Sequence, residues 1–582
     1  MKPEPRQLKR DRIWRSCVRA GIGNAQRHRR QTRRGLMLVV VLVMVVLLSL
    51  LAASYSFMVR AHLRGVIART QQFQARMAAE AGVQHAVVIL RDRQGDVSAW
   101  YDNEEELRSA LLIGHEDSEA SDKMKRRDDI RTYDKFSDFA FRYTLYGPNF
   151  DNPDDVRYGF TDESARLDMN VASEAQLRRL FELVIPEDSD HEVDINILVD
   201  SLLDWRSSGN TPRANGAKND YYGTLDPPYR CKSQPFSTVE ELLLVRGFTA
   251  WVVYGEDYNQ NGLLDPNEDD DDVSFPPDNA DGILFRGVGP YLTVWSQEMN
   301  TAADNSPRIN LNLQDLEKLE KKLEETDLDG DIISYIMDVR RAGIPFNSVM
   351  NLVPAPPPPE EEEEDGADAQ DLTPPPPATS QPDGSDATSQ PEDENTDSPE
   401  GGSSDQDETG RGSENPRSPA PVYQNLTEDE PPGEYSDLPG ILDTLTVAAT
   451  PFFQGRINVS TAPREVLAML DDLTIEEVDA IVEARRELRD EDKSSAAWLL
   501  TEGVMDENKF RGILDKITTR SSTYRIESVG FADHIGVVER ILYVIQMRGP
   551  MAQVLYYRNM NELGTAYNPY GNEGRELKNR SD

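Results

Sequence analysis

One twelve-residue segment of the sequence, 257–268, carries oxygen-bearing side chains at the spacing used by calcium-binding loops. In such loops positions one, three and five supply side-chain oxygens, position seven a backbone carbonyl, position nine often a water-mediated contact, and position twelve a bidentate glutamate. A glycine at position six, here Gly262, permits the sharp turn. The predicted ligands are Asp257, Asn259, Asn261, the carbonyl of Leu263, Asp265 and Glu268. Because hard oxygen ligands favour Ca²⁺ over transition metals, the segment predicts a calcium site.

The surrounding sequence limits what this calcium site can do. The apolar stretch 238–254 can form a helix that enters the loop, but Glu268 is followed by four aspartates and then by Pro276-Pro277, so we expect no exiting helix. A calcium sensor opens by moving two helices, and this loop is therefore predicted to be structural. Asp278 and Asp281 could contribute to a second site, although their spacing matches no known loop. The alternative is a turn rich in Asp, Asn and Gly in an acidic protein.

Other kinds of chemistry have little support in the residue types. Six histidines lack the spacing of a zinc site, and the only cysteines are Cys17 and Cys231. If the N-terminal segment is removed, Cys231 has no intramolecular partner, and no disulfide framework is expected. We find no nucleophile–base grouping, phosphate loop or distinct carboxylate pair, and we expect no enzyme. A net charge of −42 makes nucleic acid a poor partner, since phosphate binding requires a basic face.

The N-terminus predicts a membrane-anchored helix. Residues 1–35 carry twelve Lys or Arg and two acidic residues, and the twenty-five residues after Arg34 carry no charge. The apolar run 36–58 is longer than the ~20 residues that cross a bilayer, and the basic residues before it favour a cytoplasmic N-terminus. Apolar residues continue at helical spacing to Val87, which predicts one helix of about 55 residues and roughly 80 Å. The alternatives are an uncleaved signal anchor and a signal peptide cut near Leu51-Ala52-Ala53.

Three weakly similar copies of a helical module follow. Each opens with Arg, an apolar residue, Asp or Asn, an apolar residue, and Asn or Ser, and leads into an amphipathic helix. A second phrase then has two apolar residues, an acid, an apolar residue and Arg. The openings are 166–170, 308–312 and 456–460, the helices 175–181, 316–323 and 464–470, the second phrases 202–206, 336–340 and 481–485, and the closing phrases of the first two copies 235–239 and 345–349.

These copies predict small helical bundles, and they are similar to SAM-like or helix-hairpin-helix folds. DNA-binding members of that group hold a phosphate at a Gly-rich hairpin. This chain instead has Leu470-Asp471-Asp472-Leu473 at the hairpin of its third copy. We therefore expect a protein–protein surface there rather than a DNA site.

The basic leader, the glycine at its end and the apolar helix directly after it resemble the prepilin signature. By this resemblance a membrane peptidase would cut after Gly35 and leave Leu36 as the new N-terminus. Most pilin-like subunits have Glu at the fifth mature position, whereas this chain has Val40. The K-type minor pseudopilins of type II secretion also lack that acid, and the chain is identified as a member of this GspK family.

The resemblance implies a structural, non-enzymatic subunit at the tip of the pseudopilus, which assists export of folded proteins from the periplasm across the outer membrane. It implies a single-pass protein of the inner membrane with a cytoplasmic N-terminus, a periplasmic bulk and structural Ca²⁺ in the helical domain. The implied partners are other minor pseudopilins, the major pseudopilin, the prepilin peptidase and the inner-membrane assembly platform. One alternative is a membrane-anchored, calcium-dependent binding protein of the periplasm outside any secretion filament. Another is an extracytoplasmic DNA-uptake receptor, which the acidic surface disfavours.

The predicted fold class is α+β, with a pilin-like long N-terminal helix and an antiparallel sheet interrupted by a large helical insertion. Strand signals lie at 139–146, 291–295, 524–529, 540–547 and 554–557. The predicted organisation is a basic leader 1–35, a transmembrane and stalk helix 36–92, a first part of the sheet 93–165, two modules with the calcium loop 166–353, a disordered acidic Pro-rich linker 354–436, a third module 437–518, and C-terminal strands and a tail 519–582.

Overall fold

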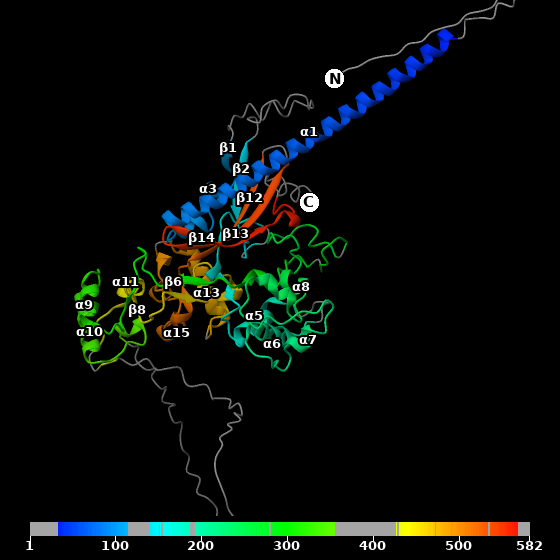
Figure 1. The fold of residues 1–582 in the computed structure, drawn as a ribbon. Helices are drawn as coiled ribbons and strands as arrows, with labels where there is room; N and C mark the ends of the chain where they lie inside the picture. Colours follow the sequence, from blue (N-terminus) through cyan, green and yellow to red (C-terminus); the bar gives the residue numbers. More distant parts are fainter. Residues whose placement is uncertain are drawn as a thin grey trace, which may run out of the picture. The chain divides into compact units, whose positions relative to one another are not determined.

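A computed structural model of the chain (Figure 1) describes residues 33–113, 140–186 apart from 151, 153 and 154, 193–354 apart from 272, 279 and 280, 426–489 apart from 428, 429 and 472, 492–532 and 536–567. The chain forms two compact units, Met1–Phe73 and Gln74–Asp582. Nearly all of the predicted leader and most of the predicted linker, 355–425, lie outside the described residues.

Helix α1, Arg33–Arg93, is continuous, and the predicted long N-terminal helix is confirmed. Every side chain from Met37 to Arg69 is exposed. Within the described part of the chain, α1 is the one helix that is long and apolar enough to cross a membrane. This first part of the helix therefore has the length and the surface of a single membrane anchor.

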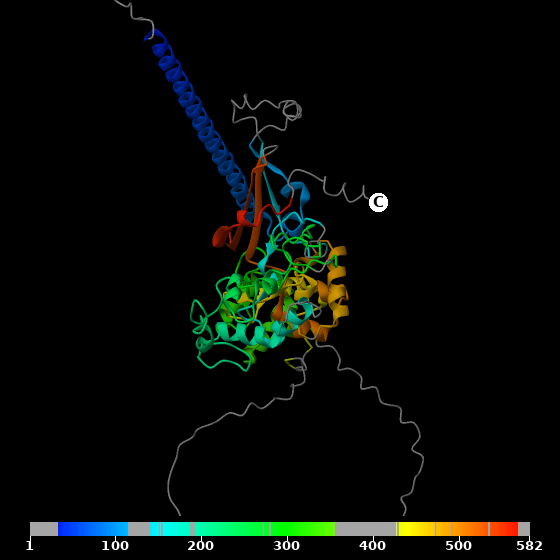
Figure 2. The ribbon, with the colours of Figure 1, turned by 90° about the vertical axis from the view of Figure 1, so that its right-hand side faces the viewer.

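The second unit is built on an antiparallel sheet. Its main strands are β1 Ala110–Ile113, β2 Phe141–Tyr146, β12 Thr523–Ala532, β13 Val538–Arg548 and β14 Met551–Asn559. They lie in the order β1-β2-β12-β13-β14, and the short strand β3, Thr161–Asp162, also pairs with β12. Thr144 of β2 lies opposite Val529 of β12, so almost four hundred residues separate two neighbouring strands. Figures 1 and 2 show the intervening helical modules gathered at one end of this sheet.

The last part of α1 packs on the sheet at very close range. A Cβ on Gly530 of β12 would lie 2.0 Å from the carbonyl oxygen of Ala75 and 2.4 Å from the amide nitrogen of Ala79. Ser528 Oγ donates a hydrogen bond to the Ala79 carbonyl at 2.8 Å. Small residues on both surfaces thus let the backbones approach, and apolar side chains beside them, such as Val83 of α1, complete the buried core.

The inserted region consists of short helices. The α-helices of the second unit after α1 are α2 Val97–Trp100, α3 Glu104–Leu107, α5 Glu174–Val184, α6 Ile195–Arg206, α7 Asn219–Tyr222, α8 Ala250–Tyr254, α9 Leu316–Glu324, α10 Gly330–Arg341, α11 Leu438–Thr444, α12 Arg464–Leu467, α13 Ile475–Glu487, α14 Trp498–Thr501 and α15 Glu507–Ile513. The 3₁₀ turns are η3 Glu163–Ala165, η4 Val239–Leu244, η5 Gly289–Tyr291, η6 Val349–Leu352, η7 Tyr435–Asp437, η8 Asp492–Ser494, η9 Leu514–Lys516 and η10 Asn561–Leu563.

The three predicted copies have the same local structure. Each opening forms a two-residue strand that pairs in parallel with a strand further along the chain. These pairs are β4 Leu167–Asp168 with β5 Leu292–Thr293, β7 Ile309–Asn310 with β8 Leu445–Thr446, and β10 Ile457–Asn458 with β11 Ile517–Thr518. Residues 445–446 were predicted to belong to the third module, but they pair with the opening of the second copy. A further pair, β6 Gln297–Met299 with antiparallel β9 Phe452–Gln454, lies between the copies.

Matched polar contacts hold the copies together. The side chain of Asn170 accepts from the amide of Phe236 and donates to its carbonyl, and Asn312 does the same with Phe346. In each copy, the arginine at the end of the second phrase donates hydrogen bonds to backbone carbonyls that follow the opening strand in sequence. These arginines are Arg206, Arg340 and Arg485. The polar residues of the repeat therefore support the backbone of each bundle.

Some elements differ from the sequence prediction. The expected strand 291–295 is only the two-residue β5, which lies in the first module and not in the main sheet. The strand expected at 540–547 has apolar contacts on both faces, because Ile541 packs under α1 whereas Leu542 packs against Met560. β1, α2 and α3 were not predicted. Each has at most four residues, too few for a clear period.

Two further expectations concern the predicted linker and Cys231. Residues 430–436, which fall in the predicted linker, contact the second module, where the Gly433 amide donates to the Leu352 carbonyl at 3.0 Å. Cys231 is buried and its thiol is free. Its amide is held by the side chain of Asn219 at 3.0 Å, so the residue is part of the packing of the first module.

Candidate metal centre

The chain enters segment 257–268 through short, strongly fixed turns. The side chain of Thr249 caps α8 by accepting from the amide of Val252 at 3.2 Å. The helix ends at Gly255, whose φ of +64° favours glycine and whose Cβ would lie 1.9 Å from the carbonyl oxygen of Phe285. The Glu256 amide then donates to that carbonyl at 2.7 Å. The expected entering helix is thus η4 and the single turn α8, and among the described residues no helix follows Glu268 before η5.

The first half of the loop is organised around Asp257. Its two carboxylate oxygens accept from the amides of Asn261 and Gly262, both at 2.9 Å. Asn259 Oδ1 accepts from the Asn261 amide at 3.0 Å, and Asn261 Oδ1 accepts from the Leu263 amide at 2.7 Å. Gly262 has a φ of +72°, as the sharp turn at position six requires. Leu263, the predicted carbonyl ligand, follows directly on this turn.

The second half of the loop folds back onto the first. Asp265 Oδ2 accepts from the side-chain amides of Asn259 at 2.7 Å and Asn261 at 2.9 Å. Glu268 Oε2 accepts from the Asp265 amide at 3.1 Å. The five side chains predicted to bind the cation therefore belong to one hydrogen-bonded cluster. Glu268 Oε1 is buried and has no hydrogen-bond partner among the described residues, and a cation bound by both oxygens of this glutamate would satisfy it.

Burial makes the carboxylates of the loop costly when they are charged. Asp257 is 3% exposed and Glu268 is 2% exposed. Burial raises the pKa of Asp257 to about 6. Burial, together with the charges of Asp257 and Asp265, raises the pKa of Glu268 to about 8. A divalent cation would neutralise these groups and remove the repulsion between them.

The donor set fits a calcium ion and does not fit a softer metal. No three His, Cys, Asp or Glu side chains in the described part of the chain are grouped so that they could hold a metal by themselves. The loop instead combines Asp and Glu with Asn side chains and a backbone carbonyl, which is the chemistry of a Ca²⁺ site. The ligands predicted from the sequence are thus brought together.

Asp278 and Asp281 accept hydrogen bonds from nearby backbone amides. Asp278 Oδ1 accepts from the amides of Asp270 at 2.9 Å and Asp271 at 3.0 Å, and Asp281 Oδ1 accepts from the amide of Ile283 at 2.7 Å. Burial, together with the charges of Asp281 and Asp278, raises the pKa of Glu256 to about 7.

The loop is also tied to the sheet. Arg540 of β13 donates at 2.6 Å to the carbonyls of both Asn259 and Gln260. Arg286 donates to the Gly262 carbonyl at 3.1 Å, and Asn261 Nδ2 donates to the Ala566 carbonyl at 2.7 Å. Sequence reasoning missed Arg540 and Arg286. The available signal for Arg540 was a charged residue at the start of an otherwise apolar strand pattern.

The predicted processing and assembly residues all lie in α1. Gly35 and Leu36 are helical, and Val40 is exposed on the first unit. All three residues belong to the first unit, whereas the loop 257–268 belongs to the second.

Comparisons with known proteins match part of the chain to one family. Residues 161–254 match the model of a family described as type II secretion system (T2SS), protein K. The type II secretion system protein K of Pectobacterium carotovorum subsp. carotovorum is 38% identical over 73 residues, which cover 12% of this chain and 21% of that relative. The first module is thus similar to protein K of type II secretion systems. The resemblance to K-type pseudopilins that the N-terminus indicated is thereby confirmed for this module.

The chain spans about a fifth of the length of the curated protein K that it matches. The family match runs from β3 to the end of α8 and stops three residues before Asp257. A crystal structure of the GspK-GspI-GspJ complex from the type 2 secretion system of enterotoxigenic Escherichia coli was also found, with 11% identity, a TM-score of 0.30, and coverage of 84% of this chain and 98% of that chain. The family assignment follows from the two sequence matches.

Proposed function

We propose that the protein is a structural minor pseudopilin at the tip of a type II secretion pseudopilus, and that it assists export of folded proteins from the periplasm across the outer membrane. The proposal depends on one observation. A protein K module is inserted between two neighbouring strands of an antiparallel sheet, and that sheet packs against the end of a helix of membrane-spanning length. A long helix with a sheet on its end is the construction of a subunit that assembles through its helix.

The N-terminus has two roles under this proposal. The peptidase removes the leader after Gly35, and the helix from Leu36 onwards stays in the inner membrane until assembly. The basic residues before it keep the N-terminus cytoplasmic, and the bulk of the chain is periplasmic. Val40 takes the place of the acid found in most pilin-like subunits, which suits a subunit at the head of the fibre.

The loop 257–268 binds one structural Ca²⁺ ion under this proposal. Asp257, Asn259, Asn261, Asp265 and Glu268 bind it through their side chains, and Leu263 through its carbonyl. Asp278 and Asp281 belong to a second acidic group whose occupancy we leave open. Since Arg540 joins the loop to strand β13 and Asn261 joins it to the segment after β14, the ion fixes the loop against the sheet domain rather than opening a sensor.

Co-isolation with partner subunits tests the assembly role. The tagged full chain is purified in detergent from membranes that contain a working secretion system, and an untagged strain is the control. The proposed role predicts that other minor pseudopilins and the major pseudopilin are recovered with it, and that cells without the chain retain their exported proteins in the periplasm. Recovery of the chain without any pilin-like subunit, with normal secretion in its absence, would instead support a calcium-dependent binding protein outside a filament.

A further inference from the structure

A cavity of about 90 Å³ lies between the sheet, the first module and the loop 257–268. Four arginines from four parts of the chain line it: Arg166 before β4, Arg286 after the loop, Arg525 of β12 and Arg558 of β14. Three carboxylates also line it, from Glu240, Asp257 and Glu527. Arg558 pairs with Glu240, and Arg525 pairs with Glu163. Arg166 and Arg286 have no carboxylate partner among the described residues, and these two point to a negatively charged occupant.

Two of these arginines have unsatisfied donors. Arg166 is 5% exposed, and its Nε is buried without a hydrogen-bond partner among the described residues. Arg286 is 7% exposed, and its Nε is likewise buried and unpartnered within the described part of the chain, although its Nη2 donates to the carbonyls of Asn149 and Gly262. A buried cation without a partner is strongly unfavourable, so a ligand that pairs with it would be bound tightly.

The acidic residues nearest to Arg166 are already engaged. Glu163 accepts from Arg525 at 2.8 Å and from Thr293, and Glu527 accepts from Tyr146 at 2.7 Å and from Arg540 at 3.2 Å. Burial, followed by the charge of Arg525, lowers the pKa of Arg166 to about 10. The local acids thus do not compensate this guanidinium fully.

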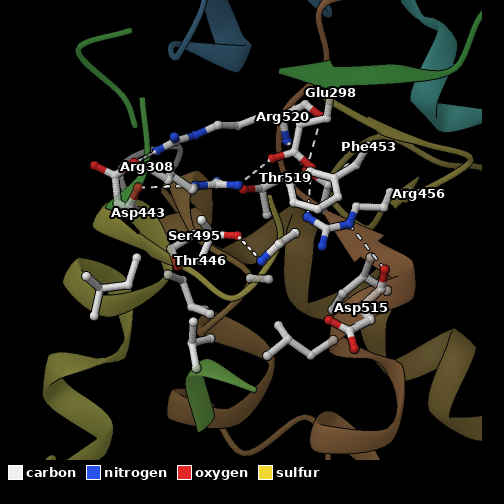
Figure 3. A pocket seen from close by; sticks show the side chains of 18 of the residues that line it. Glu298, Arg308, Asp443, Thr446, Phe453, Arg456, Ser495, Asp515, Thr519 and Arg520 are labelled. Atoms are coloured by element: carbon white, nitrogen blue, oxygen red, sulfur yellow. Dashed lines mark hydrogen bonds and ion pairs between the residues drawn. The ribbon is translucent and has the colours of Figure 1, made fainter. Parts of the chain in front are cut away.

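The internal repeat shows which kind of group is missing. Arg166, Arg308 and Arg456 occupy the same place at the opening of the three copies. In the second and third copies the arginine pairs with a buried carboxylate: Arg308 and Arg456 each lie 3.1 Å from an oxygen of Glu298 (Figure 3). No described residue forms an ion pair with Arg166, and the cavity lies beside it instead. The matched position is therefore filled by an oxyanion in two copies and by no residue of the described chain in the first.

We propose that this cavity binds one small oxyanion, a carboxylate or a tetrahedral phosphate or sulfate, between Arg166 and Arg286. A volume of about 90 Å³ leaves room for such a group. The guanidinium fork is suited to both carboxylate and phosphate geometry. The proposal does not depend on the secretion role, because it concerns residues within the second unit alone.

Titration calorimetry and thermal unfolding of the detergent-solubilised full chain test the proposal. Phosphate, sulfate and acetate are added separately in an amine buffer, with Ca²⁺ held below the concentration at which its phosphate or sulfate precipitates, and chloride at equal ionic strength is the control. At least one oxyanion should raise Tm with a saturable dependence on its concentration, whereas chloride should not. The relative effect of acetate and phosphate identifies which geometry the cavity prefers. No saturable binding of any of the three, in either measurement, would overturn the proposal.

Two variants assign the binding to the cavity. Arg166→Met removes the unpaired cation and keeps an apolar stem, so the affinity for the oxyanion should fall by about tenfold or more while the protein still folds. Arg308→Met, in the matched position of the second copy, should lower Tm in chloride because Glu298 loses one of its two arginines, yet it should keep the oxyanion response. An undiminished response in Arg166→Met would contradict the assignment, and in case that variant fails to fold, Arg286→Met provides the same comparison.

Discussion

Glu268 is the side chain on which the proposed metal centre depends most. It is buried, one of its oxygens has no partner among the described residues, and burial with neighbouring acids raises its pKa to about 8. A cation in the loop would satisfy that oxygen, and it would favour the charged form of the buried carboxylate and so lower its pKa.

Removal of the metal should therefore destabilise the protein, and Glu268→Gln should abolish that dependence. A ligand present at a hundred times its Kd stabilises a fold by about 2.7 kcal/mol, so EDTA should lower Tm measurably in the wild type. In Glu268→Gln we expect Tm to be the same with Ca²⁺ and with EDTA. The control is Glu317→Gln on the exposed side of α9, which should retain the full response. Thermal unfolding of the wild type, Glu268→Gln and Glu317→Gln, each with Ca²⁺ and with EDTA, tests this prediction. A wild-type Tm that does not change with EDTA would count against the metal site.

A second prediction concerns how Asp162 makes the free energy of unfolding depend on pH. Burial raises its pKa to about 6, whereas an unfolded Asp titrates near pH 3.9. Between these values the folded state holds a proton that the unfolded state has lost, so this residue's contribution is most favourable below about pH 4 and declines as the pH rises through 6. Asp162→Asn should remove on the order of 2–3 kcal/mol of that decline.

Denaturant unfolding at several pH values measures the difference between the variant and the wild type. Asp304→Asn is the control, because Asp304 is exposed and the hydroxyl of Ser306 lowers its pKa instead of raising it. Equal pH dependence in Asp162→Asn and the wild type would show that Asp162 stays ionised in the fold.

The contact between α1 and β12 leads to a prediction about whole elements. Gly530→Ala places a methyl group 2.0 Å from the Ala75 carbonyl oxygen, which backbone atoms cannot avoid without moving the helix off the sheet. We expect a loss of about 1–3 kcal/mol or more of unfolding free energy. Gly512→Ala in α15 is the matched control, because no atom lies within 4 Å of its Cβ position and alanine favours a helix by about 0.8–1 kcal/mol. An unchanged stability in Gly530→Ala would mean that α1 does not pack as described.

The same elements show what can be predicted from the sequence. Helix α1 and the turn at Gly262 are predictable because their signals lie in one continuous stretch, as do those of β12 to β14. The three copies are predictable because Asn170 and Asn312 recur with their partners at Phe236 and Phe346. By contrast, the hydrogen bond from Arg540 to the carbonyl of Asn259 joins residues about 280 positions apart. The sequence around Arg540 does not indicate which distant residue it contacts.

Across the whole molecule, the described chain divides into two units of different composition. One unit is an apolar helix, and the other is a sheet whose neighbouring strands β2 and β12 are divided in sequence by the helical modules. The order of the elements in the sequence does indicate that the modules are an insertion, because strand signals lie both before the first module and after the third. The unpaired Arg166 could not be predicted, because an absent partner is visible only once the fold has placed every acid around it.

The central claim is that α1 is a pseudopilin assembly helix freed from a leader, and mass spectrometry of the N-terminus of membrane-isolated protein tests it most directly. We predict a mature chain that begins at Leu36, and unprocessed chain in Gly35→Ala. Gly65→Ala, at an open position further along α1, should be processed normally. An intact N-terminus in cells that contain the peptidase, or a new terminus near Ala53, would contradict the account.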